Sequence, residues 1–292
     1  MDMRWVVLLL GAVPVLAQSE AATPPDAAAI MAKVAANVET AAAARRQFVY
    51  RQSVRSSLVR ASGQIARVEK REYSVFPGEN ATEKKMTSFH GEYRRGNQMI
   101  AYSDPGHRYK GLDIDGDLIT ELTDGLVNDK NSRDGIPHSL FPLSTKDLPG
   151  YKFTVKGRAE IQGRPAYQIG FEPTRKQTCV TVGADDECDG PAWMGDAWVD
   201  AAELQPVRIL THLAFAVPWG VRVFLGTNLR QTGFSITYLR AAENVWFPAT
   251  YGTEFRLNVL WGYKRTITMS MESNGFQRTD AKSNIQYELP PP

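Results

Sequence analysis

Residues that could carry out catalysis are present but do not form a known catalytic motif. The Gly-x-Ser-x-Gly turn of serine hydrolases, the His-Glu-x-x-His helix of zinc proteases and the glycine-rich loop of nucleotide-binding proteins are all missing from the sequence. The four histidines, His90, His107, His138 and His212, have no His or Cys at the spacing of metal ligands. We therefore predict a protein that is not an enzyme, without catalytic residues, metal or cofactor; an unrecognised hydrolase is the enzyme alternative.

Aspartates recur in Asp113-Ile114-Asp115-Gly116-Asp117, which resembles the beginning of a calcium-binding loop. In such a loop the glycine would fall at Leu118 and the bidentate glutamate at Asp124, so the pattern fails at both positions. A tight turn at Asp115-Gly116 between two strands explains these residues more simply.

The two cysteines, Cys179 and Cys188, lie close together in the sequence. In an oxidising compartment such a pair is expected to form a disulfide that closes a short loop. The carboxylates around them are hard oxygen ligands that do not match the softness of thiolates, which disfavours a shared metal site.

The first residues have the pattern of an export signal. Arg4 precedes an apolar run at residues 5–13, and Val15-Leu16-Ala17 suits signal cleavage after Ala17. The run is shorter than the roughly 20 residues that a membrane-spanning helix needs, and no Cys near the cleavage point could take a lipid. We predict a signal peptide over residues 1–17 and a periplasmic protein without a transmembrane helix.

Composition sets further bounds. The formal net charge of +2 gives no strong electrostatic footprint for nucleic acid. A chain of 292 residues with 43% hydrophobic content can bury a sizeable core, and its Trp, Tyr and Phe residues favour strands.

Hydrophobic periodicity divides the chain into a helix and many strands. Residues 18–26 are a flexible leader, and residues 27–47, with Asp26 as the cap, have the spacing of an amphipathic helix. A hairpin is predicted over 48–59 and 64–76, and its charges, which include Arg67, Glu69, Arg71 and Glu72, indicate one wet face. Weaker strands follow at 86–102 and 112–122, then an insert near 123–149 that is a surface excursion or a short helical insert.

From residue 151 the alternation of apolar and polar residues is clearest. It predicts a hairpin that turns at residues 162–165, and then strands at 197–200, 207–215, 220–225, 233–239, 246–260 and 263–273. The fold class is mainly β with helices (α+β): an antiparallel sheet of about ten strands that must curl, covered by the N-terminal helix, in a single domain over 27–289 with a tail at 290–292.

Both faces of the segment 213–224 are apolar, so neither can be fully wet. One explanation is a central strand pair covered by the N-terminal helix and a loop. The other is an apolar ligand cavity in the mouth of the curled sheet. The candidate cavity residues are Phe215, Trp219, Phe224, Phe234, Trp246, Phe255 and Trp261.

Three stretches of the sequence resemble the outer-membrane lipoprotein-sorting (LolA/LolB-like) family. They are Gly163-Arg164-Pro165-Ala166-Tyr167-Gln168-Ile169, Gly195-Asp196-Ala197-Trp198-Val199-Asp200 and Leu204-Gln205-Pro206-Val207-Arg208-Ile209. The resemblance covers mainly residues 151–273. It implies a strongly curved, half-open β-barrel whose concave face is covered by helices and receives acyl chains, with the helix at 27–47 as a lid. The chain departs from the family in its length and in its charged first hairpin, and no ligand-binding residue of the family matches a single position.

These observations favour a soluble envelope protein that binds or carries lipid or lipoprotein acyl chains in an apolar cavity. A second hypothesis is an interaction or envelope-stress sensor module that binds a partner protein with the same fold. A third is an outer-membrane barrel, because alternating strands do not show which side faces lipid.

Overall fold

The computed structural model describes residues 26–78, 82–128, 134–136, 140–175, 193–214, 233–259 and 262–279. Within these ranges eleven antiparallel strands form one curved, open sheet in the order β4-β3-β2-β1-β11-β10-β9-β8-β7-β6-β5. The strands are β1 (Phe48–Arg60), β2 (Ile65–Pro77), β3 (Thr82–Arg95), β4 (Gln98–Tyr102), β5 (Tyr151–Ile161), β6 (Arg164–Pro173), β7 (Trp193–Asp200), β8 (Pro206–Leu213), β9 (Gly233–Ala242), β10 (Val245–Val259) and β11 (Tyr263–Arg278).

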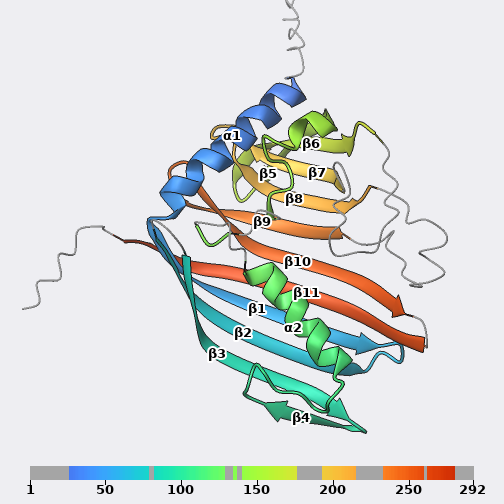
Figure 1. The fold of residues 1–292 in the computed structure, drawn as a ribbon. Helices are drawn as coiled ribbons and strands as arrows, with labels where there is room; N and C mark the ends of the chain where they lie inside the picture. Colours follow the sequence, from blue (N-terminus) through green and yellow to red (C-terminus); the bar gives the residue numbers. More distant parts are fainter. Residues whose placement is uncertain are drawn as a thin grey trace, which may run out of the picture.

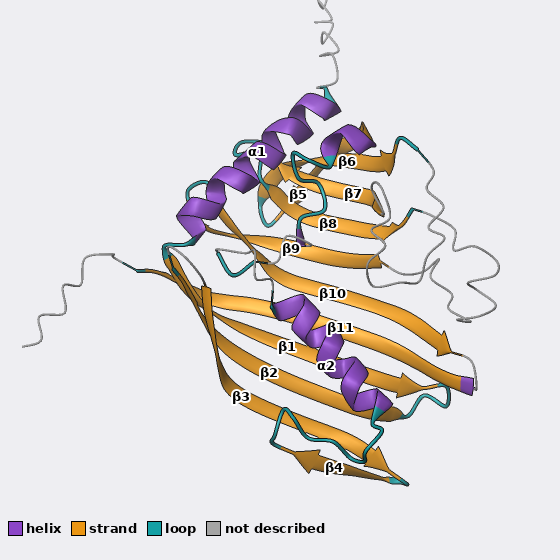
Figure 2. Cartoon of the chain, in the orientation of Figure 1, coloured by secondary structure: helices purple, strands orange, loops and turns teal. Residues whose placement is uncertain are grey.

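Two helices lie on the same side of this sheet, as Figure 1 shows. Helix α1 (Ala27–Arg45) packs on β10 and β5, and helix α2 (Ile114–Val127) packs on β1 and β2. The chain leaves one sheet edge at β4 and re-enters at the other edge with β5, after the short η2 turn (Leu148–Gly150), and α2 lies in this connection (Figure 2). The predicted mainly-β fold with an N-terminal helix is confirmed.

The N-terminal helix follows from its sequence. Alanines favour the helical backbone, and the Asp26 side chain accepts a hydrogen bond of 3.0 Å from the N–H of Ala28. Met31, Val34 and Ala35 are buried, and residues three and four positions apart lie on the same side of a helix. One stripe of the helix therefore faces the sheet.

The prediction of a strand at 112–122 is wrong, because these residues enter α2. The Asp113 side chain caps the helix by accepting from the N–H of Gly116 at 3.2 Å, and Asp115 and Asp117 lie in its first turn, where negative charge is favourable. The tight turn predicted at Asp115-Gly116 is therefore also wrong.

The count of about ten strands becomes eleven in the described ranges, because the single strand predicted at 86–102 is two. A turn at Gly96, whose φ is +58°, separates β3 from β4. The strand predicted at 220–225 lies outside the described residues.

The buried face of the sheet is built from cross-strand neighbours. Partners in an antiparallel pair point to the same face, so pairing carries one apolar row across the strands. The row runs through Val54, Met271, Tyr251, Ile236, Ile209, Ala197 and Ile169.

The charged residues of β2 do not form the predicted wet face. Arg67, Glu69 and Arg71 point inward and are buried, whereas Glu72 points outward. Arg67 donates to Asp113 at 2.7 Å and Arg71 donates to Glu69 at 2.8 Å and to Asp124 at 2.9 Å. Helix α2 covers these charges, and its carboxylates pair with the arginines beneath it.

Tyr102 completes this buried network from the edge strand β4. Its hydroxyl donates to Glu69 at 2.6 Å and accepts from Arg67 at 2.7 Å. The ring lies so close to the backbone of β3 that a Cβ on Gly91 would be 2.2 Å from it. Only glycine fits there, which is why the short edge strand can reach the network.

Replacing Arg67 by Met tests the network. The change removes the guanidinium that lies between Glu69 and Asp113. Glu69 keeps Arg71 and Tyr102, but Asp113 stays buried without its cationic partner, so we expect the free energy of unfolding to fall by about 3–5 kcal/mol. Urea denaturation measures it. The matched control is Lys70→Gln, which breaks the exposed pair with Glu72 on the same strand and should cost less than about 1 kcal/mol. Equal losses in the two variants would contradict the role of the network.

The network also makes stability depend on pH. Burial acts to raise the pKa of Asp113, but the N–H groups of Tyr109 and Gly116 and the Arg67 guanidinium together hold that pKa below its usual value. This carboxylate thus stabilises the fold above the unfolded pKa of about 3.9, and the contribution is lost as pH falls through the lower folded pKa. Urea titrations from neutral pH to about pH 3 should show the deficit of Asp113→Asn shrinking toward acid. A deficit that does not vary with pH would contradict this.

Candidate functional site

Only part of the predicted cavity lies within the described residues. Phe215, Trp219, Phe224 and Trp261 fall outside them, as do both cysteines of the predicted disulfide, Cys179 and Cys188. Phe234, Trp246 and Phe255 are described, so their relative positions can be compared.

Phe234 and Phe255 lie at the same end of the sheet on its concave face. Phe234 in β9 pairs with Thr253 in β10, and Phe255 follows two residues later on the same face, opposite the buried Ile267 of β11. The Phe234 ring contacts Trp193 of β7 at 4.9 Å between centroids and Tyr251 of β10 at 5.8 Å.

Trp246 lies at the other end of these strands. It is seven positions before Thr253 on β10, about 24 Å along an antiparallel strand. The side chain is almost fully buried, and its indole N–H donates to Glu203 at 2.8 Å. The structure therefore does not bring Trp246 together with the other two described candidates.

Glu203 collects several hydrogen bonds at the end of the strands where Trp246 lies. Besides the indole it accepts from Arg240 at 2.6 Å and from the N–H of Asn244 at 3.1 Å. Burial acts to raise the pKa of Glu203, but these hydrogen bonds, with that of Trp246 the largest, hold it below its usual value. Asn37 of α1 donates to the backbone carbonyl of Glu203 at 3.1 Å, so the helix is tied to the same turn.

At the opposite end of these strands from Trp246, five side chains with large apolar surfaces form what we call the aromatic strip. Four of them are only half-buried although they point to the concave face, and Phe234 alone is fully buried. The strip consists of Trp193, Phe234, Tyr251, Phe255 and Leu257.

The strip marks a boundary on the concave face. On β11 its neighbours are the buried Met269 and Met271, whose unbranched side chains adapt to different shapes. One strand further, the same face carries Gln52 and Ser56, and on β2 it carries the ionic network. The concave face is therefore mainly apolar from β5 to β10. Polar and charged groups gather nearer α2, among them Arg265 of β11, which donates to Asp115 of α2 at 2.9 Å.

Trp193 and Tyr251 were not among the predicted site residues. Tyr251, Phe255 and Leu257 fall on alternate positions of one strand, so the period of two could have indicated Tyr251. Trp193 comes next to Phe234 only through the pairing of β7, β8 and β9, which no local pattern shows.

The described residues hold no group of three or more His, Cys, Asp or Glu side chains that could bind a metal ion. Among the described residues, the buried ring nitrogen Nε2 of His107 finds no hydrogen-bond partner, and the ring lies against those of Tyr93 and Tyr102. In the described ranges, neither helix is long and apolar enough to cross a membrane.

The separation of Trp246 from the strip gives a prediction. Trp246→Phe removes the donor to Glu203 from a buried position, so the free energy of unfolding should fall by about 1–3 kcal/mol in urea denaturation. Trp198→Phe, on the half-buried outer face of β7, is the control and should lose less. If Trp246→Phe leaves the free energy of unfolding unchanged, the hydrogen bond from the indole to Glu203 does not stabilise the fold.

No family model matches the chain, and no curated protein matches it. Solved structures do. A DUF1329 family protein from Desulfovibrio piger is 11% identical, with 89% of this chain and 95% of that one covered and a TM-score of 0.39. A putative outer membrane lipoprotein-sorting protein domain from Vibrio parahaemolyticus is 10% identical, with 87% and 95% covered and a TM-score of 0.34.

A LolA superfamily protein from Nitrosomonas europaea is 11% identical, with 85% of this chain and 94% of that one covered and a TM-score of 0.32. At these identities and scores the likeness concerns the general course of the chain and extends to neither ligand nor activity.

Proposed function

We propose that the protein binds acyl chains of lipids or lipoproteins along the aromatic strip, without catalysis. The observation that carries the proposal is the half-burial of Trp193, Tyr251, Phe255 and Leu257 on the concave face. Side chains that complete a core are normally covered, whereas these keep apolar surface that a ligand could cover. Each methylene group buried there would contribute about 0.8 kcal/mol.

The shape of the strip suits an extended apolar ligand. Tyr251, Phe255 and Leu257 follow one another along β10, and the distance from the first to the last is about 20 Å at 3.4 Å per residue. Trp193 and Phe234 widen the strip across β7 and β9. The predicted candidates Phe215, Trp219, Phe224 and Trp261 belong to the segments next to β8, β9 and β10, and we propose that they extend the same surface.

The ion pairs near α2 limit how far a ligand could extend across the concave face. The carboxylates and guanidinium groups under α2 are paired with each other, so an acyl chain that displaced them would leave buried charges without partners. We infer that the ligand lies on the β7–β10 side of β11. Export by residues 1–17 to the periplasm remains part of the proposal, since that compartment would provide lipid or lipoprotein as cargo.

Binding of a fluorescent fatty acid to purified, delipidated protein tests the proposal. Phe255→Asp places a carboxylate in the strip, where it must lose its hydration, and we expect the affinity to fall at least about tenfold. Phe255→Leu keeps the strip apolar and should lose much less. Leu210→Asp is the matched control, because Leu210 is 40% exposed on the outer face of β8, and it should bind as the wild type does.

Two results would contradict the proposal. One is the absence of saturable fatty-acid binding by the wild-type protein. The other is an equal loss in Phe255→Asp and Leu210→Asp when urea denaturation shows both variants to be folded. A stoichiometric protein partner recovered from an envelope fraction, without lipid by mass spectrometry, would favour the interaction module instead.

A further inference from the structure

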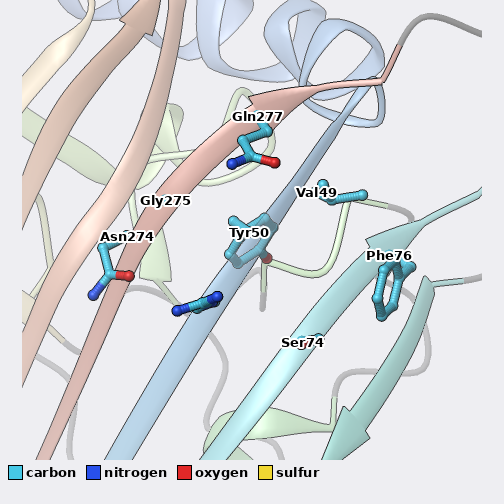
Figure 3. Close-up of a pocket in the computed structure, with 8 residues that line it drawn as sticks. Val49, Tyr50, Ser74, Phe76, Asn274, Gly275 and Gln277 are labelled. Atoms are coloured by element: carbon cyan, nitrogen blue, oxygen red, sulfur yellow. The ribbon is translucent and has the colours of Figure 1, made fainter.

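A pocket lies on the outer face of the sheet, opposite the concave face. Its volume is about 330 Å³, and Figure 3 shows side chains from β1, β2 and β11 around it. It is lined by Val49, Tyr50, Arg51, Ser74, Phe76, Asn274, Gly275 and Gln277.

An irregularity in strand pairing produces this outer pocket. Val49 pairs with Gln277 and Arg51 pairs with Asn274, so the single residue Tyr50 lies opposite two residues of β11. One of them is Gly275, whose φ of +65° is the left-handed conformation that glycine adopts at such bulges. The pocket lies over this bulge, where the regular pairing of β1 and β11 is interrupted.

The floor of the outer pocket is rigid. The Tyr50 side chain points inward, where its ring lies 5.5 Å from both Phe247 and Phe276. Its hydroxyl donates to the carbonyl of Asp134 at 3.4 Å. Buried Tyr50 thus forms the floor, whereas the walls come from exposed side chains such as Arg51 and Asn274.

The walls of the outer pocket carry polar groups in register. Pairing sets Ser74, Arg51 and Asn274 side by side across three strands, and Lys85 of β3 continues the row beyond Ser74. Gln277 lies in the next row, beside Val49. Within the described ranges, no side-chain hydrogen bond or ion pair is formed by these polar wall residues, Arg51, Ser74, Asn274, Gln277 and Lys85.

We propose that this outer pocket binds one sugar-sized anionic molecule through a carboxylate or phosphate group. The Arg51 guanidinium would hold the anionic group, since its planar fork matches both carboxylate and phosphate. The amides of Asn274 and Gln277 and the Ser74 hydroxyl supply donors and acceptors for hydroxyl groups. Val49 and Phe76 supply an apolar wall, and the volume is at the lower end of the range for ligand sites.

Arg55 is an internal control for Arg51, because it is an arginine on the same face of the same strand that does not line the pocket. Both lie on the outer face of β1 and both are exposed. Arg55 pairs with Lys70 and Ser270 in regular register and does not line the pocket. The two arginines thus differ in their surroundings while their type, strand and face are the same.

Isothermal titration of the full chain with glucose 6-phosphate, glucuronate and glucose tests the proposal. We expect saturable binding of at least one charged sugar and much weaker binding of neutral glucose; the two charged probes distinguish phosphate from carboxylate. Arg51→Gln should weaken the binding at least about tenfold, as loss of a hydrogen-bonded charge predicts. Arg55→Gln should change it less than about twofold.

The proposal would be overturned by the absence of saturable binding of either charged sugar, by glucose binding as tightly as both, or by equal losses in the two arginine variants. Asn274→Ala, at an exposed position, gives a second measure and should also weaken binding. Fatty-acid binding on the concave face should be unchanged in all three variants, so failure here is distinguishable from failure of the proposed function.

Discussion

An eleven-stranded sheet with two helices must hide more apolar surface than the helices can cover, and this constraint shapes the molecule. The period of two sends every second side chain of each strand to the concave face. Helix α1 covers β10 and β5 and helix α2 covers β1 and β2. Curvature brings the remaining strands closer to the helices, and the aromatic strip is where cover is incomplete in the described residues.

Beneath α2, part of the buried face of the sheet consists of charged side chains instead of apolar ones. Arg67, Glu69 and Arg71 occupy inward positions that apolar residues fill elsewhere, and α2 supplies Asp113 and Asp124 as partners. Ion pairs of this kind need not stabilise more than apolar packing would, but they are directional. They fix which end of α2 lies over which strand, and Asp115 ties the first turn of the helix to Arg265 of β11 in the same way.

Local sequence patterns were sufficient to predict the elements that are determined by residue spacing and capping. The helix at α1 and the alternation in β1, β5, β6 and β10 follow from spacing and capping, and the structure agrees with them. The segment 112–122 was misread because Leu112, Ile114 and other apolar residues alternate there. The step of three or four residues through Ile119, Thr123 and Leu126 carried the correct helical signal.

What depends on distant parts of the chain could not be predicted. The charges of β2 have the pattern of a solvated face, and only the return of α2 from the β4–β5 connection buries them. Trp246 is a large aromatic residue of the kind that lines cavities, yet it lies at the end of β10 away from the strip, where its indole donates to Glu203. A sequence pattern says that a side chain needs cover and does not say which segment provides it.

The pairing of the first strand with the last has a consequence for how the molecule assembles. β1 and β11 lie side by side near the middle of the sheet, although Phe48 and Arg278 are at opposite ends of the folded chain. Closing so large a loop is entropically costly and makes folding slow. The two halves of the sheet therefore join only after the whole domain has been synthesised. Until then β1 and β10 both present open edges, so a chaperone would have a long interval in which to hold the chain extended.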